Sequence, residues 1–238
     1  MSKKPVKRFE RVEVIYNSER WRLLDELRSL AMELMETLDR YHISSIVYGS
    51  IARGDVTENS DVDVFIFNPP SSFILEAALE SAGIEVQRRI IVQATPTYAI
   101  KGVLEIDDRR SISFPLVKLL SVERGFYKFG GEIDLKGLKE RKRVCGVDKR
   151  LMLIEPTPKG HFESSVVGNE EETAKILQLP VEVIRNRVRT LLRRDKVGRT
   201  GVFLQRELRA DETFEGVLKR LMDSIPSVRR RVRFSEGD

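Results

Sequence analysis

The segment VYGSIARGDVTENSDVDVFIF, residues 47–67, decides the fold of this chain. A short apolar run ends at Gly49-Ser50, and a polar stretch then leads into a second apolar run that carries Asp61 and Asp63. Because glycine allows a tight turn and a close approach, the backbone N–H groups and the Ser50 hydroxyl can face phosphate oxygens there. Strand alternation predicts that Asp61 and Asp63 lie on one face, while the valines that follow each of them point into the core.

Two carboxylates on one face repel each other unless a cation lies between them. Hard divalent ions such as Mg²⁺ prefer oxygen ligands and usually keep the phosphates of a substrate as further partners. The pattern therefore predicts a phosphate-binding turn beside a metal site, which suits nucleotidyl or phosphoryl transfer. The alternative is an ordinary turn followed by two exposed acids on an edge strand.

The spacing resembles that of the nucleotidyltransferase superfamily that includes DNA polymerase beta. The matching pattern is Gly49-Ser50, ten residues, and then Asp61-x-Asp63 between two apolar strands. The resemblance covers about residues 18–120. It implies an α/β (α+β) nucleotidyltransferase-type fold, with a mixed sheet and flanking helices.

The resemblance also implies roles for individual residues. Gly49, Ser50 and the basic Arg53 in the same loop would contact a nucleoside triphosphate. Asp61 and Asp63 would bind Mg²⁺ or Mn²⁺ and act in catalysis.

The resemblance departs from the family pattern at a third carboxylate, which the family usually supplies from a neighbouring strand. Residues 94–119 are similar in layout to the corresponding region of archaeal CCA-adding enzymes, another branch of the superfamily. The matching position here is close to Ser113, and a hydroxyl cannot replace a carboxylate as a charged metal ligand. Glu105, on the preceding predicted strand, is the candidate for the third catalytic acid. A nucleotidyltransferase fold and an active nucleotidyltransferase are therefore separate expectations.

Composition excludes several classes of protein. The chain has 238 residues, of which 41% are hydrophobic and 33% charged, as expected for a globular protein. Its one cysteine allows no internal disulfide, and with only two histidines a Cys/His zinc site is excluded. No apolar run approaches the ~20 residues that cross a bilayer. We therefore expect a cytoplasmic protein without a membrane partner.

Charge is distributed unevenly along the chain. Residues 1–138 hold 19 Lys/Arg and 21 Asp/Glu, whereas residues 139–238 hold 23 and 16. We predict a nucleotidyltransferase-like domain at 1–138 and a basic domain at 139–238. A basic domain favours a polyanion partner, although basic residues also simply solvate helical surfaces.

Residues 170–205 resemble a helix-turn-helix of the winged type. Helices are predicted at 170–177 and about 181–195, followed by a short hairpin, the wing, at 196–208. Arginines recur every fourth residue on the second helix, as is required for reading a major groove. The residues predicted to contact DNA or RNA are Arg185, Asn186, Arg189, Arg193 and Arg199. The arginines between residues 229 and 233 would add phosphate contacts. The alternative is a solvated basic helix that docks on the first domain.

Two functions remain open from the sequence. The first is a metal-dependent enzyme that transfers a nucleotidyl group from a nucleoside triphosphate to a nucleic-acid or protein acceptor. The second is a catalytically weak or inactive nucleotidyltransferase fold that serves as a DNA-binding transcriptional regulator.

Overall fold

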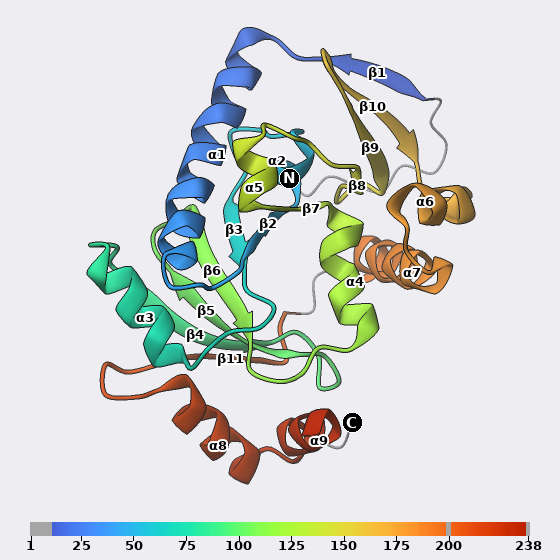
Figure 1. The fold of residues 1–238 in the computed structure, drawn as a ribbon. Coiled ribbons are helices and arrows are strands. Elements are labelled where there is room, and N and C mark those ends of the chain that lie inside the picture. The colour runs from blue at the N-terminus through green and yellow to red at the C-terminus, as the bar shows by residue number, and fades with distance from the viewer. Residues whose placement is uncertain (1–10, 199–200, 237–238) are drawn as a thin grey trace. The chain divides into compact units, whose positions relative to one another are not determined.

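The protein is described by a computed structural model that covers residues 11–198 and 201–236 (Figure 1). The chain forms two compact units that alternate along the sequence. The first consists of Met1–Ser29, Val47–Asp61 and Arg124–Thr200, and the second of Leu30–Ile46, Val62–Glu123 and Gly201–Asp238. The predicted boundary after residue 138 falls inside the first unit, so residues 139–238 are divided between the two.

The first unit combines short strands with helices. Its strands are β1 (Val12–Ile15), β2 (Ile46–Tyr48), β7 (Glu132–Asp134), β8 (Gly146–Val147), β9 (Met152–Thr157) and β10 (Gly160–Ser165). Its helices are α2 (Ser50–Arg53), α5 (Leu135–Lys139), α6 (Glu170–Leu177), α7 (Val181–Val197), the first half of α1 (Ser18–Asp39) and the part of α4 (Ser121–Gly130) that begins at Arg124. Strands β1, β10, β9 and β8 form an antiparallel sheet in that order.

Helices α6 and α7 confirm the two helices predicted after residue 169. The break between them lies at Gln178, whose left-handed φ of 50° ends α6. Both helices contribute to one buried cluster, which also includes residues of α4 and of the β8–β10 region. Its fully buried members are Phe129, Val147, Leu151, Leu153, Val166, Ala174, Leu177, Ile184 and Val188. The apolar stripe of α7 therefore packs inside the first unit.

The second unit is built on a mixed sheet, as the sequence predicts. Its strands are β3 (Val62–Phe65), β4 (Arg88–Gln93), β5 (Ile100–Glu105), β6 (Arg110–Pro115) and β11 (Leu204–Glu207). They are ordered β11-β4-β5-β6-β3, with β3 parallel to β6 and the other pairs antiparallel. The helices of this unit are α3 (Ser72–Ser81), α8 (Phe214–Ser224), α9 (Pro226–Glu236) and the second half of α1.

The two faces of this sheet differ in polarity. One face is mostly buried, and Val62, Val64, Leu104, Ile112 and Phe114 supply its buried side chains. The opposite face is partly exposed, and we call it the polar face. Its partly exposed members are Asp63, Lys101, Val103, Glu105 and Ser111. Alternation along each strand explains the difference, because directly paired residues point to the same side of the sheet.

The C-terminal helices pack within the second unit. The ring of Phe214 contacts that of Phe114 at a centroid distance of 5.1 Å, and Gly102 leaves room for both rings. In α9, Arg231 is only 4% exposed and forms a buried ion pair of 2.8 Å with Glu123. The expectation that Arg231 contacts phosphate in an exposed tail is therefore wrong, because its guanidinium is used inside the unit.

The hairpin predicted at residues 196–208 is also wrong for the residues that the structure describes. Leu204–Glu207 is a single strand, β11, and pairs with β4 in the register Leu204↔Gln93. This pairing satisfies the backbone groups of a β4 edge that would otherwise be open. Arg199 lies outside the described residues. None of the helices in residues 11–198 and 201–236 is long and apolar enough to span a membrane.

A buried histidine links β1 and β10 of the first unit. The Tyr16 hydroxyl lies 2.5 Å from Nδ1 of His161, and burial raises the pKa of Tyr16 to about 12. Tyr16 therefore keeps its proton and donates it to a neutral His161. Burial also lowers the pKa of His161, although Asp55 and Glu163 favour its charged form. Protonation of His161 would remove the acceptor that Tyr16 uses.

We expect the stability of the protein to fall as the pH drops below about 6.5. The unfolded state binds a proton at His161 before the folded state does, so acidification favours unfolding by at most about 1.4 kcal/mol per pH unit. The stabilising contribution of neutral His161 is fully present above the pKa of the unfolded state. Urea unfolding of the wild type and of His161→Asn at pH 5 to 8 measures this dependence.

The other histidine, His42, is exposed and provides the matched control. His42→Asn should keep the wild-type pH dependence, whereas His161→Asn should flatten it between about pH 5 and 6.5. If the stability of the wild type and that of His161→Asn depended equally on pH, this would contradict the assignment of the pH dependence to His161.

Candidate functional site

The turn at Gly49-Ser50 is held by backbone contacts of the first unit. Gly49 adopts a φ of 81°, a conformation that other residues rarely adopt, and its N–H donates to the Gly131 carbonyl at 2.9 Å. The chain then enters α2, a helix of only four residues. Such a helix has no stability of its own, because nucleation is unfavourable, so it depends on tertiary contacts.

Arg28, on α1, provides one of these contacts. Its guanidinium donates to the Ile51 carbonyl at 3.0 and 3.1 Å and to the Ala52 carbonyl at 3.2 Å. Burial lowers the pKa of Arg28 to about 10. The Ile51 and Ala52 carbonyls of α2 are therefore hydrogen-bonded to a side chain of the long helix α1.

Arg53, on α2 itself, provides the second contact. It is 5% exposed, and both Nε and Nη2 lie 2.9 Å from the Asp55 carboxylate. Its Nη1 donates to the Gly130 carbonyl at 2.5 Å and, at the longer distance of 3.4 Å, to the Val147 carbonyl. The structure thus places this guanidinium in a buried network rather than at a surface where it would meet phosphate. The role in nucleotide binding predicted for Arg53 is replaced by a structural one.

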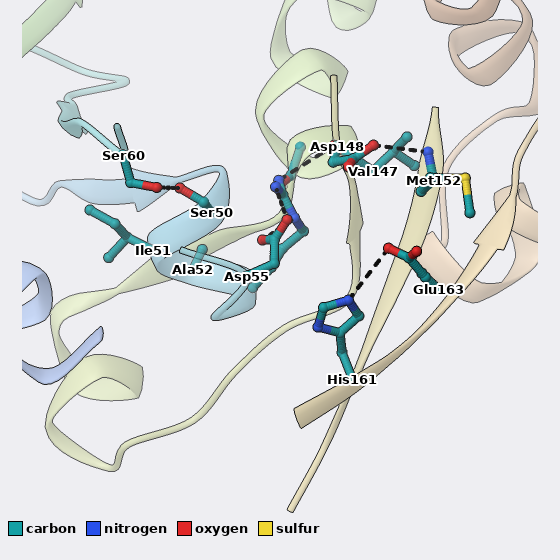
Figure 2. Close-up of polar contacts among 12 residues, drawn as sticks. Ser50, Ile51, Ala52, Asp55, Ser60, Val147, Asp148, Met152, His161 and Glu163 are labelled. Carbon is teal, nitrogen blue, oxygen red and sulfur yellow. Dashed lines mark hydrogen bonds and ion pairs between the residues drawn. The ribbon is translucent and has the colours of Figure 1, made fainter. Parts of the chain in front are cut away.

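Ser50 lies next to the segment that carries the aspartates (Figure 2). Its hydroxyl donates to Ser60 Oγ at 3.1 Å, and Ser60 Oγ also accepts from the Thr57 N–H at 2.9 Å. Asp61, which follows Ser60 directly, is exposed. The first unit therefore brings together three of the predicted residues, Gly49, Ser50 and Asp61.

Asp63 lies on β3, on the polar face of the second unit. The residue directly opposite it on β6 is Ser111, whose hydroxyl donates to the Asp63 carboxylate at 2.9 Å. Ser113, near which the sequence places the missing acid, is buried and lies opposite Phe65. The neighbouring strand therefore presents a hydroxyl, not a carboxylate, to Asp63.

Glu105 lies on the same face but on β5, so β6 separates it from β3. It is directly opposite Ser111 and forms a 3.1 Å ion pair with Arg88 on β4. Its role as a third acid stays a prediction.

Asp61 and Asp63 are predicted to bind one hard divalent ion, and carboxylates are among the ligands that such an ion prefers. Asp61 is exposed and Asp63 is partly exposed, and Mg²⁺ is commonly held by one or two carboxylates together with substrate phosphates. A second ion would need a further carboxylate. Among residues 11–198 and 201–236 there is no group of three or more His, Cys, Asp or Glu side chains that could hold a metal ion.

The basic residues of α7 lie on its exposed side. Arg185, Asn186, Arg189 and Arg193 are all exposed, and Arg185 forms an ion pair with Glu171 on α6. The residues of α7 predicted to contact nucleic acid are therefore accessible to solvent, although Arg185 already forms an ion pair within the protein.

Three polar residues of these regions were not predicted from the sequence. They are Ser60, Ser111 and Lys101. Lys101 had a readable signal, since it alternates with buried Ile100 and Gly102 in a predicted strand. No local sequence pattern indicated that Ser111 pairs with Asp63, because the register between two strands cannot be inferred from the sequence of one strand.

We expect Arg53→Met to destabilise the protein by about 3 kcal/mol, because removal of one partner leaves the buried Asp55 carboxylate without its counter-ion. The double variant Arg53→Met/Asp55→Asn should recover part of the loss. Arg22→Met, an exposed arginine of α1, is the control. Urea unfolding measures all three, and wild-type stability of Arg53→Met would contradict the structural role.

Comparison with known families agrees with this geometry. Residues 29–117 match the model of a family described as "Nucleotidyltransferase domain". No curated protein and no solved structure matches the chain. The matched segment contains Gly49, Ser50, Asp61 and Asp63, and it ends before α6 and α7. The predicted fold is therefore confirmed, and residues 29–117 are similar to a nucleotidyltransferase domain.

Proposed function

We propose that the protein transfers a nucleotidyl group from a nucleoside triphosphate to a nucleic-acid or protein acceptor, with Mg²⁺ or Mn²⁺ bound by Asp61 and Asp63. The observation that carries the proposal is the hydrogen bond between Ser50 and Ser60, because it joins the glycine turn to the residue before Asp61. The glycine turn is thus hydrogen-bonded, within the first unit, to the residue that precedes Asp61.

Each residue has a distinct task in this reaction. The Ser50 hydroxyl rotates from Ser60 to a phosphate oxygen, and Gly49 keeps the backbone close to the same phosphate. Asp61 and Asp63 bind the ion, which supplies positive charge to the transferred phosphoryl group when bound. Ser111 orients the Asp63 carboxylate by its hydrogen bond. The single cysteine of the chain favours a reducing compartment, so we place this activity in the cytoplasm.

We expect Asp61→Asn and Asp63→Asn each to lower transfer of a labelled nucleotide by at least about a hundredfold, because each removes a charged ligand of the ion. The assay combines Mn²⁺ or Mg²⁺, each labelled triphosphate, and RNA, DNA and protein acceptors. Glu105→Gln tests the third acid in the same assay. Asp25→Asn, an exposed acid of α1, is the control.

Transfer that survives in both aspartate variants would contradict the proposal. A rate for Glu105→Gln close to that of the wild type would show that Glu105 is not the third acid, and would leave the roles of Asp61 and Asp63 intact.

A second candidate function is DNA-binding regulation by a fold with weak or no catalysis. Two observations favour it. The residue opposite Asp63 is a serine, and α7 exposes Arg185, Arg189 and Arg193 beside Asn186. The first unit also holds most of the positive charge of the chain, with 27 Lys/Arg against 19 Asp/Glu in the three segments that form it. Such a surface suits a nucleic-acid backbone in either function.

We expect the protein to bind duplex DNA or RNA with an affinity that falls steeply with salt. Arg189→Ala/Arg193→Ala should reduce the slope of log K against log[salt] by about two, since each phosphate contact contributes about 0.9. Lys149→Ala/Lys159→Ala, which removes two exposed charges elsewhere in the first unit, should leave the slope unchanged. No binding at low salt would exclude nucleic acid as a partner.

A further inference from the structure

Strand β1 has an open edge on the first unit. In the part of the chain that the structure describes, it is the outermost strand of the sheet β1-β10-β9-β8, with β10 on one side only (Figure 1). The Tyr16 N–H donates to the Lys159 carbonyl at 2.9 Å, so Tyr16 directs its backbone groups towards the β10 side. This direction alternates along an antiparallel strand, and the backbone groups of Arg11, Glu13 and Ile15 therefore point away from β10.

Two side chains of this edge are apolar and exposed. Ile15 is 67% exposed and Val12 is 40% exposed. Val12 lies on the same side of the sheet as Glu163, its partner on β10, and as His161, which are only 8% and 2% exposed. The exposure of Val12 therefore comes from the open edge and not from the face on which it lies. An exposed edge strand of this kind is a template for pairing with a further strand.

The charged residues of this edge are self-complementary. Arg11 and Glu13 flank Val12, and both side chains leave from the opposite face of the sheet. If a second copy pairs antiparallel about Val12, Arg11 of each copy lies directly opposite Glu13 of the other. Both residues have outward backbone groups, so each such pair is also hydrogen-bonded, with Cα atoms about 5.5 Å apart. Pairing about Glu13 instead would place two carboxylates opposite each other, which is destabilising.

Arg11 is held on this face by contacts of its own chain. Its Nη2 lies 3.3 Å from the Glu155 carboxylate on β9, and its guanidinium lies over the ring of Phe162 at 4.3 Å from the centroid. The side chain is nevertheless 58% exposed, and a guanidinium carries several N–H donors. Arg11 can therefore donate to Glu13 of a second copy while it keeps Glu155, and little further ordering of its side chain is needed.

We propose that β1 is a dimerisation edge, at which two copies of the protein pair their β1 strands antiparallel about a two-fold axis at Val12. The two Val12 side chains meet at the axis, and one Arg11–Glu13 pair lies on each side of it. The two sheets thereby become one continuous sheet, and the contact is closed because the same edge is used by both copies. This inference goes beyond the proposed function, since it requires neither a nucleotide nor a metal ion.

Sedimentation velocity of the full-length protein tests the dimer. We expect a monomer–dimer equilibrium between about 1 and 200 µM, because association depends on protein concentration. Glu13→Arg should weaken dimerisation at least about tenfold, since it places two arginines opposite each other on each side of the axis. Arg11→Glu/Glu13→Arg exchanges the two charges and should recover most of the loss. Glu26→Arg, which changes an exposed glutamate of α1 in the same unit, is the control and should dimerise like the wild type.

A cysteine on the axis tests the register. The Cα atoms of the two Val12 residues would be about 4.5 Å apart, which is within the range of a disulfide. Val12→Cys should therefore form an intermolecular disulfide under mild oxidation. Ile15→Cys should not, because its two copies would be about 20 Å apart. Peptide mass spectrometry distinguishes these links from any link through Cys145, the one native cysteine.

A wild type that stays monomeric at about 200 µM would overturn the proposal. A dimer whose dissociation constant is unchanged in Glu13→Arg would overturn it as well, because the interface would then lie elsewhere. Cross-linking of Ile15→Cys without cross-linking of Val12→Cys would overturn the axis at Val12. Circular dichroism and urea unfolding of each variant show whether a lost dimer reflects the interface or a lost fold, and the charge exchange in the double variant restores the dimer only in the first case.

Discussion

The buried guanidinium of Arg53 is the interaction on which the candidate site depends. It joins the one-turn helix α2 to Asp55 and to the carbonyls of Gly130 and Val147. A four-residue helix would not persist alone, so the position of Ser50 follows from this network and from Arg28, which holds the carbonyls at the other side of α2. The position of the Gly49-Ser50 turn is therefore set by charged groups inside the first unit.

The second unit carries charged side chains on strands of its sheet. Its sheet has one mostly buried face and one polar face, and Lys101 and Asp63 both lie on the polar face. Buried charges are tolerated only when they are paired, and Glu123 and Arg231 meet this condition within hydrogen-bond distance.

The nucleotidyltransferase motif and the helix-turn-helix have different support. The motif lies within residues 29–117, which match a nucleotidyltransferase domain, and its glycine turn is hydrogen-bonded to Ser60, the residue before Asp61. Helices α6 and α7 have the predicted length and buried stripe, but the predicted wing is replaced by a strand that pairs with β4. The proposed nucleic-acid partner therefore rests on the exposed arginines of α7 and on the excess of basic residues in the first unit.

The sequence by itself determined the features that depend on neighbours along the chain. These are the turn at Gly49-Ser50, the strand that carries Asp63, and the helices α6 and α7, because glycine conformation and apolar periodicity act over a few residues. Tertiary structure decided the rest: Arg53 became buried, Ser111 came to face Asp63, and Leu204–Glu207 joined β4. The physical reason is that strand register and the burial of a charge depend on partners far away in sequence, which no local pattern records.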